Sequence, residues 1–282
     1  MQIRQLDHQA VLSLLPDRKA DSHKGNYGKI LLLCGSRGYT GAAYLAAMGA
    51  LRSGAGLVYL GVPESIYDIE AVKLHEPVIF PLPDRDGKLS REGLEQILSR
   101  LPGMDAVLIG PGLGQSEDTF LVTREILRRA TCPVIVDADG INVLSGHMDI
   151  VRERQYPTIL TPHAGEFRRI GGDPETDRIP EAMDFAARWG CILLLKGHHT
   201  VITDGKECYV NLTGNPGMAT GGSGDVLSGI IVSLLGQGIR PLKAAACGAW
   251  LHGAAGDICA AELGQYSMLP SDMLQVLSRL MK

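Results

Sequence analysis

The sequence lacks any block of like charge and any long hydrophobic run. Its 27 lysine and arginine residues nearly balance 31 aspartate and glutamate residues, giving a formal net charge of −4. This balance argues against a nucleic-acid partner or an anionic membrane surface, although local basic residues could still bind a phosphorylated small molecule. No stretch reaches the roughly 18 apolar residues of a membrane-spanning helix. The first residues include Arg4, Asp7 and His8 without the apolar run of a signal peptide, so we expect a cytoplasmic protein.

Paired cysteines are also missing. No two of the six cysteines form a Cys-x-x-Cys motif, and several lie within apolar runs. We therefore expect buried, reduced thiols. The neighbouring His198 and His199 have no third ligand at a useful spacing, so we predict no metal-ligating residues. The cysteines are Cys34, Cys132, Cys191, Cys208, Cys247 and Cys259.

Two common nucleotide-binding motifs are incomplete. Residues 35–41 are rich in glycine but lack the Gly-Lys-[Ser/Thr] ending of a P-loop. Residues 110–114 read Gly-Pro-Gly-Leu-Gly, which has the wrong spacing for the dinucleotide-binding fingerprint of dehydrogenases. A dehydrogenase is therefore disfavoured.

Short apolar runs alternate with helical patterns along the chain. The runs are bounded by glycine, proline or aspartate, which is typical of buried strands. Continuous apolar strands separated by helices predict an α/β fold, with a mostly parallel central sheet and helices on both faces. Hydrophobic residues make up 45% of the chain and no linker or repeat is evident, so we expect a single domain over residues 1–282. The predicted strands are 30–33, 57–61, 106–109, 134–136, 158–160 and 192–195, with a hairpin of 201–203 and 209–212 joined by Asp204-Gly205; the predicted helices are 41–52, 119–130, 180–189, 225–235, 241–263 and 270–280.

Glycine-rich and polar segments follow the predicted strands. In such sheets, ligands bind beyond the carboxyl ends of the strands. The convergence of several segments at one sheet edge therefore predicts a ligand site more strongly than any one of them. The segments are Gly35-Ser36, Gly110-Pro111-Gly112, Asp137-Ala138-Asp139, Thr161-Pro162-His163 and Lys196-Gly197.

The most informative stretch runs from Asn215 to Asp225 and reads Asn-Pro-Gly-Met-Ala-Thr-Gly-Gly-Ser-Gly-Asp. Its glycines allow unusual backbone angles and close approach of a ligand, and they lead into an apolar helix. The unpaired amides and the dipole of a helix start favour a phosphoryl group. Asp225 could take a proton from a substrate hydroxyl while these amides stabilise the transferring phosphoryl group. The alternative is that Asp225 only caps the helix.

This loop resembles the Gly-[Ser/Thr]-Gly-Asp anion-hole signature of ribokinase-like enzymes, with Ser223 where many relatives have threonine. Other segments resemble the NAD(P)H-hydrate dehydratase family, and they follow the family's order from about residue 24 to residue 257. The resemblance covers most of the chain and implies a ribokinase-like fold, without the epimerase domain that is fused in some relatives. The matching segments are 24–36, 39–47, 51–58, 110–114, 137–139, 161–166, 196–200 and 215–225.

The resemblance implies a nucleotide-dependent repair reaction. In the family, the substrate is NADHX or NADPHX, in which water has added to the nicotinamide ring. The ring hydroxyl is phosphorylated and phosphate is then expelled, because phosphate is a better leaving group than hydroxide. The resemblance also implies a homotetramer, Mg2+, and ADP or ATP, with ADP favoured because the chain looks like the stand-alone bacterial forms. The preference between NADHX and NADPHX stays open.

The resemblance further implies roles for individual residues. Asp225 matches the base at the hydrate hydroxyl, and the glycines beside it match the anion hole. A lysine at a strand end can bind phosphate, and small residues let a dinucleotide lie close. The implied residues are Asp225, Gly222 and Gly224 for catalysis; Lys196, Gly197, His198, His199, Thr200 and Gly224 for the adenine nucleotide; and Ala42, Gly112, Gly114, His163 and Asp225 for the hydrate.

Several of these residues also have purely structural interpretations. Lys196 could be a solvated charge at a strand end, Ala42 could serve helix packing, and His163 could be a loop histidine. Glu166 suits the start of a helix, and it could also help to position magnesium. Asp139 and Asn142 could lie near the phosphates or only form a turn and a helix cap.

Two other functions remain as alternatives. A ribokinase-like kinase of a small alcohol, such as a vitamin precursor, would use the same anion hole. A non-catalytic nucleotide-binding module would not need Asp225. The segment 24–47 favours the dehydratase over the kinase, and the complete set of expected polar positions disfavours the binding module.

Overall fold

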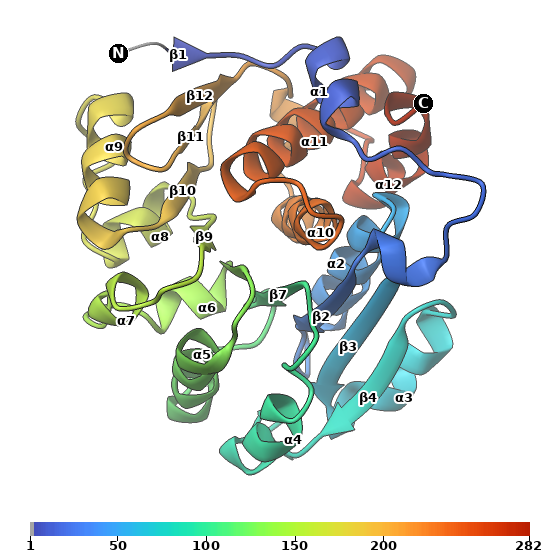
Figure 1. Cartoon of the computed structure of the whole chain (residues 1–282), viewed down its shortest axis with the longest axis vertical. Helices are drawn as coiled ribbons and strands as arrows, with labels where there is room; N and C mark the ends of the chain where they lie inside the picture. Colours follow the sequence, from blue (N-terminus) through green and yellow to red (C-terminus); the bar gives the residue numbers. More distant parts are fainter. Residues whose placement is uncertain (1–2) are drawn as a thin grey trace.

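A ten-stranded sheet forms the centre of the protein, whose computed structural model describes residues 3–282 (Figure 1). The strand order is β1-β12-β11-β10-β9-β8-β7-β2-β3-β4. Neighbouring strands are parallel except in the pairs β10/β11 and β11/β12. The prediction of a mostly parallel α/β sheet is confirmed. The strands are β1 (Ile3–Arg4), β2 (Lys29–Leu33), β3 (Leu57–Pro63), β4 (Val78–Leu82), β7 (Ala106–Ile109), β8 (Val134–Val136), β9 (Thr158–Leu160), β10 (Ile192–Leu195), β11 (Thr200–Thr203) and β12 (Cys208–Asn211), while β5 (Asp84–Arg85) and β6 (Lys88–Leu89) form a separate pair.

Helices cover both faces of this sheet (Figure 1). One face carries α2, α10, α11 and α12, and the other carries α4, α5, α7, α8 and α9, since the apolar residues of each group fall in separate core clusters. The helices are α1 (His8–Leu14), α2 (Thr40–Arg52), α3 (Glu64–Lys73), α4 (Leu94–Leu98), α5 (Glu117–Arg129), α6 (Asp139–Asn142), α7 (Asp149–Arg152), α8 (Ala164–Arg169), α9 (Arg178–Trp189), α10 (Ser223–Gly236), α11 (Pro241–Leu263) and α12 (Pro270–Leu280).

Strand β2 shows why the apolar runs are continuous. Successive side chains of a strand point to opposite faces of the sheet. Ile30 and Leu32 accordingly join the core layer beneath α2 and α10, whereas Leu31 and Leu33 join the layer beneath α5 and α9. All four side chains are fully buried, because both faces of the strand are covered by helices. A polar residue would therefore be unfavourable on either face, and the apolar run is continuous.

Helices α2 and α10 touch each other backbone to backbone. A Cβ atom at Gly229 would lie 2.2 Å from the carbonyl oxygen of Ala46, and one at Gly49 would lie 2.7 Å from that of Val226. Only glycine allows such an approach. The two helices that start at the carboxyl edge of the sheet are therefore held at a short, fixed separation.

Most predicted elements agree with the structure to within two residues, and the differences have physical reasons. The antiparallel hairpin is present, but its turn is the four-residue loop 204–207, because Thr203 pairs with Cys208. In this loop, Oδ1 of Asp204 accepts hydrogen bonds from two backbone amides. The edge strand β4 lies outside the predicted set, since it contains Pro81 and is exposed at Val78, which breaks the pattern of a buried strand.

Further expectations concern the whole chain. Each of the six cysteines is free and buried, as predicted. Among residues 3–282, no helix combines the length and apolarity needed to cross a membrane. The single-domain prediction covers residues 1–282, of which Met1 and Gln2 lie outside the described residues, and it stays a prediction.

Candidate active site

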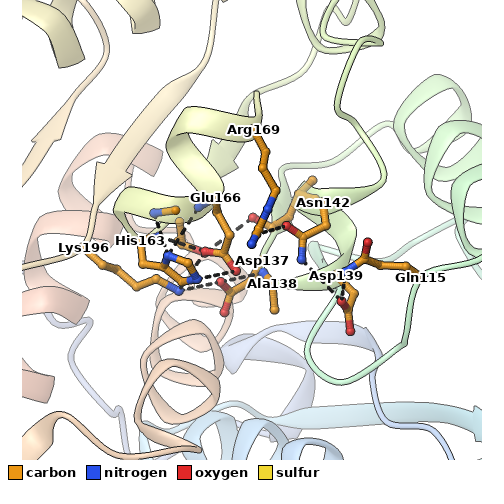
Figure 2. Close-up of polar contacts among 12 residues, drawn as sticks. Gln115, Asp137, Ala138, Asp139, Asn142, His163, Glu166, Arg169 and Lys196 are labelled. Carbon is orange, nitrogen blue, oxygen red and sulfur yellow. Dashed lines mark hydrogen bonds and ion pairs between the residues drawn. The ribbon is translucent and has the colours of Figure 1, made fainter. Parts of the chain in front are cut away.

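Polar side chains from the ends of three neighbouring strands meet at the carboxyl edge of the sheet (Figure 2). Lys196 follows β10, and its Nζ lies 3.0 Å from Oδ1 of Asp137, which follows β8. The same Nζ lies 3.8 Å from Oε2 of Glu166 on α8. Burial alone would lower the pKa of Lys196, but the charges of Asp137, Glu166 and Asp225 outweigh it and raise that pKa. Lys196 is therefore a charged, largely buried centre of the cluster, and its interpretation as a solvated charge is wrong.

The glycine-rich loop ends in the first turn of α10. Gly222 is the N-cap residue with φ +96°, and no side chain caps the helix. Asp225 lies inside the first turn, so the alternative that it only caps the helix is wrong. A Cβ atom at Gly221 would meet no atom within 4 Å, and one at Gly224 would meet only Nζ of Lys196, at 3.4 Å. The loop therefore borders open space beside a cation, which suits an anionic ligand.

Asp225 has the electrostatics of a general base. Burial raises the pKa of its carboxyl group, and the negative charge of Asp137 raises that pKa further. The positive charge of Lys196 opposes both effects, and the resulting pKa is about 6. At neutral pH the carboxylate is thus mostly ionised, yet it is a stronger base than an ordinary aspartate.

His163 starts α8 through a reciprocal cap with Glu166. Its Nδ1 accepts hydrogen bonds from the backbone amides of Gly165 and Glu166, at 2.9 and 3.3 Å. Oε2 of Glu166 accepts a hydrogen bond from the backbone amide of His163 at 2.8 Å. Because Nδ1 is an acceptor, the neutral ring carries its proton on Nε2, which lies 3.5 Å from Oε1 of Glu166. The histidine is therefore a helix cap whose Nε2–H remains able to donate.

The small residues predicted to line the hydrate pocket come together. A Cβ atom at Gly112 would lie 2.7 Å from Cβ of Ala42 and 3.0 Å from Cβ of Tyr39. Gly112 also has φ +64°, a conformation that favours glycine. The hydroxyl of Ser36 donates to the carbonyl of Gly112 at 2.7 Å. The loops after β2 and β7 are thus joined beside the start of α2.

A hydrogen-bond chain holds the next part of this loop. The backbone amide of Gly114 donates to Oδ2 of Asp139 at 2.8 Å. Asn142 donates to Oδ1 of Asp139 at 3.4 Å, and Arg169 donates to Asn142 at 2.7 Å (Figure 2). The preceding Ala138 has φ +48°, which is strained for a residue with a side chain. Asp139 therefore holds the backbone of Gly114, and Asn142 contacts Asp139.

The residues predicted to bind the nucleotide lie in two different environments. Lys196 points into the carboxylate cluster, whereas His198 and His199 are exposed, with ring centroids 3.8 Å apart. Gly197 has φ +149°, and a Cβ atom there would lie 2.6 Å from Nη1 of Arg178. The segment ends at Thr200, whose hydroxyl donates to the carbonyl of Gly197 at 3.0 Å.

Two residues near the site are absent from the sequence interpretation. Arg178 donates to the carbonyl oxygens of Leu195 and Lys196, at 3.0 and 3.2 Å, and so supports the nucleotide segment. His252 on α11 lies behind the glycine-rich loop, with its Nε2 3.2 Å from Oγ of Ser223. Neither residue belongs to a recognisable motif, so only the tertiary structure reveals them.

The structure does not gather every predicted residue around one point. Gly222, Gly224, Asp225 and Lys196 meet at the start of α10, and Ala42 meets Gly112. The exposed His198 and His199 lie at the start of β11 instead. Among residues 3–282, no group of three or more histidine, cysteine, aspartate or glutamate side chains is placed to hold a metal ion.

The chain is similar to known proteins along most of its length. The family model for NAD(P)H-hydrate dehydratase matches residues 30–279. The chain is 47% identical over 272 residues to a bifunctional NAD(P)H-hydrate repair enzyme of Moorella thermoacetica, covering 94% of this chain and 51% of that protein. It therefore spans about half the length of the bifunctional relatives that it matches.

Relatives of similar length come from Bacillus subtilis. The chain is 36% identical over 280 residues to its ADP-dependent (S)-NAD(P)H-hydrate dehydratase, covering 96% of this chain and 95% of that one. A crystal structure of the ADP/ATP-dependent dehydratase of B. subtilis, co-crystallised with ATP and Mg2+, matches with a TM-score of 0.86 and 33% identity. It covers 99% of this chain and 98% of that chain. The predicted ribokinase-like fold is confirmed.

Proposed function

The chain belongs to the NAD(P)H-hydrate dehydratase family, and we propose that it uses ADP or ATP to dehydrate (S)-NADHX and (S)-NADPHX to NADH and NADPH. One observation carries this proposal. Asp225, with its pKa raised to about 6, lies in a first helical turn whose preceding loop borders open space beside Lys196. Such an arrangement can deprotonate an alcohol at the place where a phosphoryl group is bound.

The first proposed step is phosphoryl transfer to the hydrate. Asp225 takes the proton of the ring hydroxyl as the hydroxyl oxygen forms a bond to the terminal phosphorus of the nucleotide. The bond between that phosphorus and the bridging oxygen breaks, and its electron pair leaves with the shortened nucleotide. The amides at the start of α10 and the ammonium of Lys196 offset the negative charge on the phosphoryl oxygens.

The second proposed step is elimination. The carbon–oxygen bond breaks and phosphate leaves with its electron pair, the neighbouring ring carbon loses a proton to solvent, and the electron pair of that carbon–hydrogen bond forms the ring double bond. Hydroxide would be a poor leaving group in the same position. The net reaction converts hydrate and nucleotide into NAD(P)H, shortened nucleotide, phosphate and a proton, so the oxygen of the added water ends in the phosphate.

We propose ADP as the preferred nucleotide. The B. subtilis relative that is matched along nearly its whole length is described as ADP-dependent. Lys196 would meet the phosphates, because its ammonium lies beside Gly224. The exposed, stacked rings of His198 and His199 offer an aromatic face to adenine, with Gly197 and Thr200 completing the segment.

The hydrate would lie on the other side of Asp225. Ala42 and Gly112, which pack against each other, would form one wall of the pocket for the nicotinamide end. Gly114, held by Asp139, would line the same pocket. His163 would donate from Nε2 to the hydrate.

The donors present fit a magnesium ion that arrives with the nucleotide. Glu166 and Asp137 offer carboxylate oxygens, the ligands that Mg2+ prefers. In nucleotide sites, Mg2+ is commonly held by one or two carboxylates together with phosphates and water. Bound there, the ion would neutralise charge on the phosphates.

A repair assay tests the proposal. Purified protein is incubated with NADHX, Mg2+ and either ADP or ATP, and the NADH absorbance is followed. Recovery of the band supports the proposal, and no recovery with either nucleotide overturns it. Stable phosphorylation of a heterocyclic alcohol would instead identify a small-molecule kinase. An Asp225→Asn variant in parallel shows whether any recovery depends on this site.

Two statements about the whole protein complete the proposal. The protein would act in the cytoplasm, as a homotetramer. Fractionation of cells and light scattering of the purified protein test these two statements independently of the assay.

A further inference from the structure

A buried histidine stands behind the proposed phosphoryl site. His252 lies on α11, and its Nε2 is 3.2 Å from Oγ of Ser223, the first residue of α10. Both residues are 8% exposed. Ser223 lies between Gly222 and Gly224, so its hydroxyl belongs to the loop assigned to the phosphoryl group. This pair links α11 to that loop through one side-chain hydrogen bond.

The direction of this hydrogen bond decides what Ser223 can do. A hydroxyl has one proton and two lone pairs. If Ser223 donates to His252, its hydroxyl can present only lone pairs to a phosphoryl oxygen. If His252 donates from Nε2, the hydroxyl proton of Ser223 is free to point at the phosphoryl group. Only the second arrangement stabilises negative charge in the loop.

We propose that His252 is a positioning residue: as the neutral tautomer with its proton on Nε2, it donates to Ser223 and so commits the hydroxyl proton of Ser223 to the phosphoryl group. This proposal rests on the proposed function, because it assumes a phosphoryl group at the start of α10. The environment of His252 fits a neutral ring. Burial lowers the pKa of His252 to about 4, although an interaction with the backbone of Ser223 opposes this effect, and the nearby positive charge of Lys196 contributes to the lowering.

Kinetics of three variants test the proposal. His252→Leu removes the donor, and we expect kcat to fall about 10-fold with the KM values for nucleotide and hydrate unchanged. His252→Gln retains an N–H donor at a similar reach and is expected to recover most of that loss. His8→Leu is the matched control, since His8 also contacts α11, but by stacking on Trp250 instead of bonding to Ser223, and wild-type kcat is expected.

A double-mutant cycle separates positioning from packing. In a Ser223→Ala background, His252→Leu should cause no further loss of kcat, because the group through which it acts is gone. A His252→Leu loss of the same size in both backgrounds would overturn the proposal. So would equal kcat values for His252→Leu and wild type when both are shown to be folded by their thermal transitions.

A spectroscopic measurement tests the protonation of His252 without requiring catalysis. Nitrogen-15 NMR of the imidazole, assigned by its loss in His252→Gln, reports which nitrogen carries the proton. A signal for protonated Nε2 and bare Nδ1 at pH 7 supports the proposal, and the reverse tautomer overturns it. If the wild-type protein fails to repair NADHX, the proposed function fails by itself, whereas this measurement still tests the hydrogen bond.

Discussion

The ammonium of Lys196 lies 3.0 Å from the Asp137 carboxylate and so joins the ends of two strands that are separated by β9. The contact spans 59 positions of the chain. Asp137 is almost completely buried, and the ion pair with Lys196 offsets the cost of burying its carboxylate. Burial is the main reason why the pKa of Asp225 is raised, and within this pair Asp137 raises that pKa further whereas Lys196 lowers it.

Replacing Lys196 by methionine should move the pH dependence of the reaction. The pKa of Asp225, about 6 in the unaltered protein, should rise when the positive charge is removed. Since the base must be ionised, kcat/KM should fall with decreasing pH around pH 6 in wild type and at a higher pH in the variant. Lys196→Arg keeps the charge and is the control. An unchanged acidic limb in Lys196→Met would contradict the electrostatic coupling.

Replacing Asp225 by asparagine should abolish most of the turnover. Asparagine is nearly isosteric but cannot accept the hydroxyl proton, so kcat should drop by about 100-fold to 10,000-fold. Binding of ADP, measured by calorimetry, should persist because the loop amides and Lys196 remain. Unchanged turnover would remove Asp225 from the role of base and would favour a non-catalytic binding module.

The same variant should be more stable than the wild type at alkaline pH. The pKa of Asp225 is raised from 3.8 to about 6 in the folded protein, so folding disfavours its ionised form. The free energy of unfolding is therefore lowered as pH rises between these two values, by about 2–3 kcal/mol in full. Asp225→Asn avoids this cost. We expect its Tm to exceed that of wild type by several degrees at pH 8 and to match it at pH 3.5; equal Tm values at pH 8 would show that folding does not raise this pKa.

Adding a side chain at Gly112 should displace the start of α2 and so weaken hydrate binding. An alanine there would bring its Cβ to 2.7 Å from Ala42 and would strain a backbone with φ +64°. We expect KM for NADHX to rise about 10-fold or more. Gly146→Ala is the matched control, because Gly146 has φ +77° and an added Cβ there would meet no atom within 4 Å. If both variants raise KM equally, strain and not the pocket is responsible.

The sequence predicts the strands and the first turn of α10 for different reasons. A strand buried on both faces must be apolar at every position, so β2 and its neighbours stand out as continuous runs. The glycines before Asp225 stand out because close approach and a positive φ at Gly222 exclude side chains. The apolar runs and the glycine-rich loop each depend on residues that are neighbours in the sequence, so both can be recognised without the structure.

The other contacts of the site join residues that are far apart in the sequence. The hydrogen bonds between Gly114 and Asp139, between Asn142 and Arg169, and between Ser223 and His252 join residues that are 25, 27 and 29 positions apart. A histidine within an alanine-rich helix and an arginine at the start of α9 have no pattern that distinguishes them from packing or solvated residues. Only the arrangement of the helices around the sheet brings them to the site.

The glycine contact between α2 and α10 has a mechanical consequence. Ala42 lies in the first turn of one of these helices and Asp225 in the first turn of the other, while Gly49 and Gly229 lock the two backbones together. The two residues at the ends of the proposed reaction centre, Ala42 and Asp225, are thus held at a fixed separation by the packed pair of helices. Ligand entry is therefore not expected to separate the two helices, because separation would break this backbone contact.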